Sequence, residues 1–276
     1  MEPIYIIALI ITGIAVGFFG GMLGVGGCFI MVPVMIAVYP AAYPSASTDT
    51  IVRLAFGTNL LVVFPTAMMG AYNHDKKGAV WWRAGLYIGA FTAIGVVVGA
   101  ILAAHTPGAT LKAIFGAAVL IGAVRMITAK PPKVGEEPIK DLRIWLAVGV
   151  PMGVVIGLIG IGGGLLMVPL MAIILHFKIH NAVGTSTAIM MITSIIGAIA
   201  YALNGLNVSD LPEYSIGYVN LLAWICLAAT SVPMAIVGVK AAHKTKPKEL
   251  KNIFAVVLFY VGLKMIGVFK VLGLPL

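Results

Sequence analysis

Long apolar stretches alternate with short polar ones along the whole chain. The ten apolar segments run approximately from 4 to 22, 28 to 39, 51 to 72, 84 to 104, 112 to 128, 142 to 160, 164 to 176, 182 to 203, 217 to 240 and 251 to 270. Eight of them approach the roughly 20 residues that a helix needs to cross the hydrocarbon of a membrane. The other two, Cys28 to Tyr39 and Gly164 to His176, have only 12 and 13 residues. Each of these is predicted to be half of a re-entrant or broken helix hairpin.

The composition places this chain in a membrane. Only 10% of its 276 residues are charged, 61% are hydrophobic, and the mean hydropathy is +1.09. Such a chain cannot bury its apolar surface inside a water-soluble fold, so we predict an all-α polytopic membrane protein without a sizeable soluble domain. Met1, Glu2 and Pro3 lead directly into the first apolar segment, which we therefore expect to be retained and not cleaved as a signal peptide.

One glycine-rich stretch is present twice. Gly17 to Met35 (GFFGGMLGVGGCFIMVPVM) aligns with Gly153 to Met171 (GVVIGLIGIGGGLLMVPLM). The identical positions, in the numbering of the first copy, are Gly17, Gly21, Gly24, Gly26, Gly27, Met31, Val32, Pro33 and Met35. Glycines that interrupt apolar runs at corresponding places of two related halves point to the binding site of a transporter.

The similarity continues beyond these glycines. Ala55 to Asn59 aligns with Ala182 to Ser186, and Gly70 aligns with Gly197 further along the same segments. The halves match from end to end, and a polar, proline-containing stretch separates them. The predicted division is a first transmembrane repeat at 1–128, a cytoplasmic linker at 129–141 and a second transmembrane repeat at 142–276.

The basic residues predict how the segments are oriented. If each glycine-centred hairpin returns the chain to the side from which it came, each half adds three crossings, and this odd number inverts the second half. The loops at 73–83, 125–143, 177–181 and 240–251 then lie in the cytoplasm, as the positive-inside rule favours. The inside bases are Lys76, Lys77, Arg83, Arg125, Lys130, Lys133, Lys140, Arg143, Lys178, Lys240, Lys244, Lys246, Lys248 and Lys251, and the outside bases are Arg53, Lys112, Lys264 and Lys270.

The predicted architecture is therefore two inverted-topology repeats, each a glycine-broken re-entrant helix hairpin plus three transmembrane helices. The protein is expected in the cytoplasmic membrane with both termini outside. Its net charge of +9 is confined to short loops and segment ends, so we expect lipid and a small molecule as partners, and no nucleic acid.

The duplicated motif resembles a known family. Leu23 to Gly27 (LGVGG) and Ile159 to Gly164 (IGIGGG), each followed by a Val-Pro pair, are similar to the paired signatures of the TauE/SafE permeases. The resemblance covers nearly the whole chain. It implies a two-repeat transporter of sulfite, sulfonates or other small organosulfur anions. One departure is that Cys28 stands in the first copy where the second has Gly164.

Physical chemistry also predicts an anion site at the two glycine clusters. Glycine lets the backbone turn inside the membrane and expose consecutive N–H groups, and the short helix that follows points the positive end of its dipole at the turn. Two such turns from inverted halves are expected to hold a small oxyanion near the midplane. The alternative is that the glycines only let helices pack closely. The predicted substrate-binding residues are Gly26, Gly27, Cys28, Thr58, Asn59, Gly162, Gly163, Gly164, Thr185 and Ser186.

Four of these residues have polar side chains near the start of the third segment of each half. They are Thr58 and Asn59 in the first half and Thr185 and Ser186 in the second. Their hydroxyl and amide groups either donate hydrogen bonds to an oxyanion or satisfy backbone groups nearby.

Ion coupling has no obvious carrier, because every carboxylate falls in a loop, a terminus or a segment end. This leaves a facilitated or potential-driven anion pathway, or coupling to protons or to sodium held by backbone carbonyls. His105 and His243 hold equivalent places before the last segment of each half, where they either relay protons or simply end helices. Arg53 either attracts anions or anchors its helix at the interface.

Two other function classes remain open. Cys28 at the start of a half-helix suggests a membrane enzyme that carries sulfur covalently, although no base lies near it in the sequence. The other class is a subunit of a membrane complex that transports nothing itself. The motifs predict no cofactor, metal site or nucleotide-binding loop, and they leave open the anion, the direction of transport and the oligomeric state.

Overall fold

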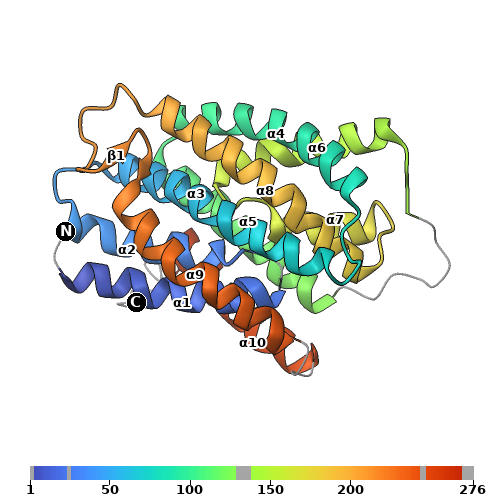
Figure 1. Cartoon of the computed structure of the whole chain (residues 1–276). Helices are drawn as coiled ribbons and strands as arrows, with labels where there is room; N and C mark the ends of the chain where they lie inside the picture. The colour runs from blue at the N-terminus through green and yellow to red at the C-terminus, as the bar shows by residue number, and fades with distance from the viewer. Residues whose placement is uncertain (1–2, 24–25, 129–137, 243–246, 269–276) are drawn as a thin grey trace.

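The computed structural model describes residues 3–23, 26–128, 138–242 and 247–268, and these residues form a helical bundle (Figure 1). The helices are α1 (Pro3–Leu23), α2 (Cys28–Ala42), α3 (Thr48–Asp75), α4 (Trp82–His105), α5 (Gly108–Thr128), α6 (Leu142–Ile159), α7 (Gly164–Ile173), α8 (Ile179–Asn204), α9 (Leu221–Ala242) and α10 (Pro247–Ile266). Each of the ten predicted apolar segments overlaps one of these helices, so the prediction of a helical membrane protein is confirmed.

One short hairpin departs from the all-helical prediction. The strands β1 (Ser215–Ile216) and β2 (Val219–Asn220) pair antiparallel, so α9 begins at Leu221 and not at the start of the apolar run. Gly217 forms the tip, with a φ of 52°, and a Cβ atom there would lie 1.8 Å from the carbonyl oxygen of Ala202. Close approach of this tip to α8 therefore requires glycine and prevents the helix from starting earlier.

Seven of the described helices are long and apolar enough to cross a membrane: α1, α3, α4, α5, α6, α8 and α9. The helices α2 and α7, which follow the glycine clusters, are shorter. The chain is therefore a multi-pass membrane protein in which each half has a long helix, a short helix and then further long helices.

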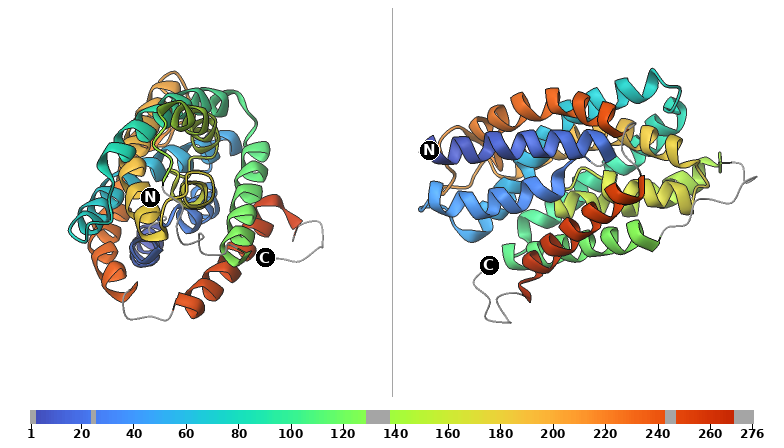
Figure 2. Two further views of the ribbon diagram at one scale, coloured as in Figure 1. Left: turned by 90° about the vertical axis from the view of Figure 1, so that its right-hand side faces the viewer. Right: turned by 90° about the horizontal axis from the view of Figure 1, so that it is seen from below.

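The first helix of each half packs on the other half. Helix α1 lies along α9, and α6 lies along α4. A Cβ atom at Gly17 would lie 2.2 Å from Ser231 O, and one at Gly153 would lie 2.0 Å from Thr92 O, so glycine permits both contacts. The two halves are thus intertwined and do not form separate bodies. Helices α5 and α10 form a further pair (Figure 2).

Contacts between helices give their relative directions. Gly57 of α3 lies against Tyr201 of α8, and Gly70 lies against Thr187, so α3 and α8 cross antiparallel. Along both α1 and α3, successive residues contact successively later residues of α9, so both helices run parallel to α9. In the same way, α6 and α8 run parallel to α4. Consequently α1 and α3 run in one direction and α6 and α8 in the opposite one.

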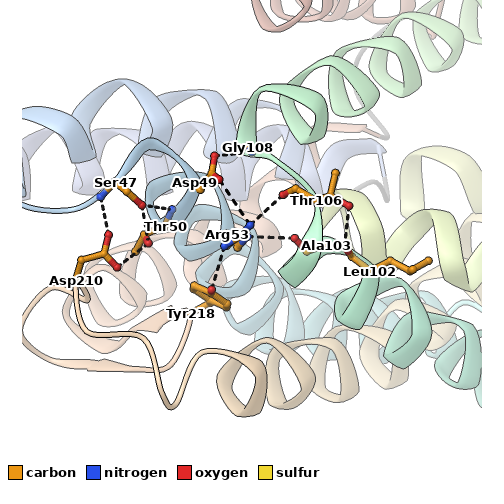
Figure 3. Close-up of polar contacts among 10 residues, drawn as sticks. All are labelled: Ser47, Asp49, Thr50, Arg53, Leu102, Ala103, Thr106, Gly108, Asp210 and Tyr218. Atoms are coloured by element: carbon orange, nitrogen blue, oxygen red, sulfur yellow. Dashed lines mark hydrogen bonds and ion pairs between the residues drawn. The ribbon is translucent and has the colours of Figure 1, made fainter.

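A polar cluster ties the elements together at one end of the bundle, which we call the Arg53 end (Figure 3). The guanidinium of Arg53 donates from Nε to Ala103 O (3.1 Å), from Nη2 to Thr106 O (3.0 Å) and from Nη1 to Tyr218 Oη (3.2 Å). The Arg53 side chain is only 14% exposed, and its Nη2 lies 3.8 Å from Asp49 Oδ2. Arg53 thus joins α3 to the end of α4 and to the β hairpin.

Asp210 attaches the segment after α8 to the same end. Its carboxylate accepts hydrogen bonds from Ser47 N and from Thr50 Oγ1, both at 2.8 Å, while Asp49 accepts one from Gly108 N at 2.7 Å. These two acids therefore bind the start of α3 to both halves.

The opposite end, which we call the His74 end, contains the segment 73–82 and the start of α8. Trp81 N donates to Thr185 Oγ1 (3.0 Å), and Ile139 N donates to Leu175 O (3.0 Å). The course of the helices places these described bases here: Lys76, Lys77, Arg83, Arg125, Lys140, Arg143, Lys178 and Lys240. Most of the predicted linker at 129–141 lies outside the described residues.

Candidate functional site

The first glycine turn reverses the chain between α1 and α2. Gly26 and Gly27 have φ values of 74° and 67°, which L side chains rarely adopt. Helix α2 then begins at once, because Gly27 O accepts hydrogen bonds from Ile30 N and Met31 N. A Cβ atom at Gly27 would lie 2.6 Å from Val16 O in α1. The turn is therefore pressed against the helix that precedes it.

The second glycine turn has the same construction. Gly160, Gly162 and Gly163 have φ values of 61°, 74° and 109°, and Gly163 O accepts from Leu166 N and Met167 N at the start of α7. The residues of this turn are buried. No described carbonyl or side chain accepts a hydrogen bond from the amides of Gly162 or Gly163. The turn therefore holds buried donors at the positive end of a helix.

The two turns converge on one side chain of α3. A Cβ atom added at Gly26 would lie 3.5 Å from Val63 Cγ1, and one added at Gly162 would lie 2.9 Å from the same atom. Met190, which aligns with Val63 in the repeat, brings its Cε onto Gly26 from α8. Segments 136 residues apart in the sequence thus meet where α3 and α8 cross.

Two of the predicted site residues have matching partners in the two halves. Thr58 Oγ1 accepts a hydrogen bond from Asn220 N (2.9 Å) just before α9, and Thr185 Oγ1 accepts one from Trp81 N (3.0 Å) just before α4. Each threonine therefore satisfies a backbone donor at the start of a helix of the other half. This places their hydroxyls at the contact between the two halves.

Asn59 lies at the second glycine turn. Its Nδ2 donates to the carbonyl oxygen of Gly160, and its side chain is fully buried. Ser186, the aligned residue, instead donates to Val183 O within its own helix (2.8 Å). Thr193 adds a hydrogen bond from Oγ1 to Gly162 O (3.0 Å). The side chains of α3 and α8 thus hold the carbonyls of this turn and leave its amides open.

A crevice adjoins the first turn. It has an open volume of about 10 Å³, which is the room of roughly one water molecule. Its lining runs from the turn to the His74 end and comprises Gly20, Gly21, Gly26, Thr66, Ala67, Gly70, His74, Thr187 and Met190. The lining of the crevice therefore includes one residue of the first turn, Gly26, and one residue of the basic end, His74.

Larger side chains occupy the aligned positions beside the second turn. Ile156 stands where the first half has Gly20, and its Cδ1 would lie 2.9 Å from a Cβ at Gly163. Tyr201 stands at the position of His74, and its hydroxyl donates to Gly157 O (2.9 Å). Leu60 takes the place of Thr187. All three are buried, so the second turn is covered on the side facing the Arg53 end.

Cys28 and the histidines are the remaining candidates. Cys28 is fully buried at the start of α2. His105 is an exposed residue at the end of α4, with Nδ1 2.9 Å from Ile101 O, whereas His243 lies outside the described residues. Within the described part of the chain, no group of three His, Cys, Asp or Glu side chains is placed to hold a metal ion.

A larger cavity of about 290 Å³ is remote from the glycine turns. It opens at the Arg53 end, between the segments 42–45 and 211–214. Since none of its lining residues belongs to either turn, size alone does not identify the site in this molecule.

Sequence reasoning missed several residues of this region. Val63 and Met190 look like ordinary core residues, and the difference between Gly20 and Ile156 lies inside the duplicated stretch. Position-by-position comparison of the two copies is the signal that would have found them, because the copies differ where one turn is open and the other is covered.

Known proteins resemble this chain along most of its length. A probable membrane transporter protein of Methanocaldococcus jannaschii is 29% identical over 261 residues, covering 94% of each chain. One from Haemophilus influenzae is 26% identical and covers 95% of this chain and 98% of its own. A third, from Bacillus subtilis, is 25% identical and covers 96% and 99%. No solved structure matches.

The family model described as sulfite exporter TauE/SafE matches residues 9–265. This span includes both glycine turns, Val63 and the crossing helices α3 and α8. The chain is therefore a membrane transporter protein that belongs to the TauE/SafE family.

Proposed function

We propose that this protein carries a small sulfur-containing anion, such as sulfite or a sulfonate, across the cytoplasmic membrane. The family's description as sulfite exporters supports the substrate class. The observation that carries the proposal is the convergence of two glycine turns on Val63, each at the N-terminus of a short helix.

The turns offer an anion what it needs inside a membrane. The first amides of α2 and α7 belong to the N-terminal turns of helices, where backbone donors and the helix dipole favour negative charge. Buried amides without acceptors, such as those of Gly162 and Gly163, are costly in lipid unless a ligand or a cavity meets them. A tetrahedral or pyramidal oxyanion would supply the missing acceptors.

The helix directions support an inverted repeat. In the arrangement that we propose, the second half is the inverted counterpart of the first, in keeping with the antiparallel α3 and α8 and with α1 and α6 following their directions. In this arrangement the α1–α2 and α6–α7 pairs are re-entrant hairpins that approach each other from opposite sides. The eight bases named above and Lys248 and Lys251 at the start of α10 lie toward the His74 end, against Arg53, Lys112 and Lys264 toward the other, and this asymmetry favours a cytoplasmic His74 end with both termini outside.

The crevice then marks a cytoplasmic route to the first turn. At about 10 Å³ it is too small for a sulfite-sized anion, so passage requires α3, α8 and the hairpins to separate. Transport would proceed by exposing the shared site alternately to the His74 end and to the Arg53 end.

Anion flux into sealed liposomes tests the proposal. Purified protein is reconstituted and assayed with sulfite, sulfate, thiosulfate, taurine and sulfoacetate under imposed proton and sodium gradients. The variant Gly70→Leu places a side chain in the crevice, and we expect it to reduce flux by at least about tenfold. The matched control Gly70→Ala should retain most of the flux, because its Cβ would lie 3.5 Å from Thr187, an ordinary contact.

Two results would contradict the proposal. One is the absence of protein-dependent flux for every anion in the panel. The other is equal flux from the wild type and from a Gly70→Leu protein that elutes as a single species in detergent.

A further inference from the structure

Only one of the two polar atoms in the side-chain amide of Asn59 forms a hydrogen bond. Its Nδ2 donates to Gly160 O, while its Oδ1 has no hydrogen-bond partner although the side chain is fully buried. Exchanging the two atoms would set Oδ1 against the carbonyl of Gly160, so the bond fixes the orientation. An unmet buried acceptor costs about 1–3 kcal/mol. A bound ligand that interacts with this oxygen would remove that cost.

The surroundings of this oxygen favour a positive charge. Helix α6 ends at Ile159, and the carbonyls of its last turn form the negative end of the helix dipole. Asn59 binds the chain directly after that end. Unwound carbonyls and the C-terminal ends of broken helices are the groups that hold coupling cations in transporters built from inverted repeats. Oδ1 of Asn59 adds a neutral oxygen to this set.

No acid competes for that role among the described residues. Asp49, Asp75, Asp141, Asp210 and Glu213 all lie at helix ends or in loops, and Glu249 is the third residue of α10. Within the described membrane-spanning helices, no buried carboxylate is available to bind a coupling proton. A site of neutral oxygens is therefore a means of coupling that needs no acidic side chain.

We propose that Asn59 Oδ1 and the carbonyls at the C-terminal end of α6 bind a small monovalent cation. In the α6–α7 break the negative end of α6 and the positive end of α7 face the same gap, so a cation and an anion can bind side by side. Their mutual attraction is strong where water is excluded. The role in coupling rests on the proposed anion transport, whereas cation binding itself does not.

Thermal unfolding of the purified protein tests cation binding without any transport. The protein is unfolded in detergent in NaCl or in choline chloride at equal ionic strength, with no sulfur anion present. A ligand that binds only the folded state raises Tm in a saturable way, and we expect a rise of roughly 5 °C in NaCl relative to choline chloride.

Variants at one position of each half locate the effect. Asn59→Ser installs the residue of the aligned position and removes the amide oxygen, so the sodium-dependent rise should disappear. Ser186→Ala changes the aligned residue of the other half and should leave the rise intact. If Asn59→Ser is too unstable to purify, Asn59→Leu provides the same loss with a side chain of similar size.

The outcomes separate the two proposals. A Tm that responds equally to sodium and choline, as expected if water occupies the site, overturns the cation site, and anion flux in sodium-free medium would then leave the proposed function standing. A sodium-dependent rise that persists in both Asn59 variants also overturns it. A rise lost only in the Asn59 variants, together with no anion flux, would sustain the cation site and refute the proposed function.

Discussion

The two glycine turns have similar sequences, and Gly26 and Gly27 in the first turn have positive φ values as Gly162 and Gly163 do in the second, yet the surroundings of the turns differ. The first is bordered by a crevice toward the His74 end, and the second is covered toward the Arg53 end. Three aligned pairs account for this: Gly20 and Ile156, His74 and Tyr201, and Thr187 and Leu60. In each pair the residue beside the second turn is larger or more apolar.

This comparison separates the residues that form the proposed binding site from the residues that control access to it. Glycines at repeated positions build two similar turns, but the side chains around each turn decide whether a path reaches it. Since the three pairs differ in sequence, the difference between the two sides is encoded in the chain and does not arise only from the conformation adopted. The Arg53 cluster reinforces it, because it joins both halves at the covered end.

The largest expected effect comes from making the second turn resemble the first. Ile156→Ala removes a fully buried side chain that covers Gly163. The cavity should lower the free energy of unfolding by about 3 kcal/mol. Reversible unfolding in detergent measures it, with Val155→Ala, at a 38% exposed neighbour, as the control. An Ile156→Ala protein as stable as that control would show that Ile156 does not seal the turn.

Releasing the Arg53 end should have the next largest effect. Arg53→Ala removes three hydrogen bonds, to Ala103 O, Thr106 O and Tyr218 Oη. Because two of these acceptors are carbonyls at the end of α4 that lose their donor, we expect a loss of about 2 kcal/mol. The same unfolding measurement applies, with Lys112→Ala as control. Similar losses in both variants would argue against a specific role for the Arg53 cluster.

Thiol labelling compares access to the two turns directly. Thr66 lines the crevice, whereas its aligned residue Thr193 is bound to Gly162 O beside the covered turn. In a background carrying Cys28→Gly and Cys226→Ala, Thr66→Cys should react with a membrane-impermeant reagent at least about tenfold faster than Thr193→Cys, a difference of about 1.4 kcal/mol. The faster reaction should occur from the His74 end. Equal rates would remove the distinction between the turns.

The smallest expected effect is a loss of local stability around Asp210 at acidic pH. Partial burial acts to raise the pKa of Asp210, but the hydrogen bonds from Ser47 N and Thr50 Oγ1 outweigh it, so its pKa lies below the usual value of 3.8. A lowered carboxyl pKa contributes stability that is present above pH 4 and is lost as the pH falls through the folded-state pKa.

Hydrogen exchange of the segment 205–220 should report this loss. We expect exchange in the wild type to rise by less than about tenfold as the pH falls from about 5 to 3, after correction for intrinsic rates, since the carboxylate is largely exposed. Asp210→Asn should show no such rise over the same range. A wild type as insensitive to pH as this variant would mean that the carboxylate does not hold the segment.

Much of the fold could be predicted from the sequence. Apolar length located the helices, and the repeated glycines located both turns, because consecutive residues with positive φ select glycine wherever they occur. The start of α9 was missed, since the tip at Gly217 is set by its approach to Ala202 in α8. Thr58 and Thr185 were expected either to donate to the anion or to satisfy nearby backbone groups, and the structure shows both hydroxyls accepting from backbone donors of the opposite half, which leaves their role toward an anion a prediction. The roles predicted for the glycines of the turns remain to be tested.

Composition and repetition by themselves determined that the chain lies in a membrane, where its helices are, and where two of the helical stretches break. These features depend on hydrophobicity and backbone freedom, which are properties of local sequence. Only the tertiary structure decided that both turns meet at Val63, that Asn59 keeps an oxygen without a hydrogen-bond partner at one break, and that a small crevice adjoins the first turn. These features depend on which helices of the two halves interlock, and that follows from packing between residues far apart in the chain.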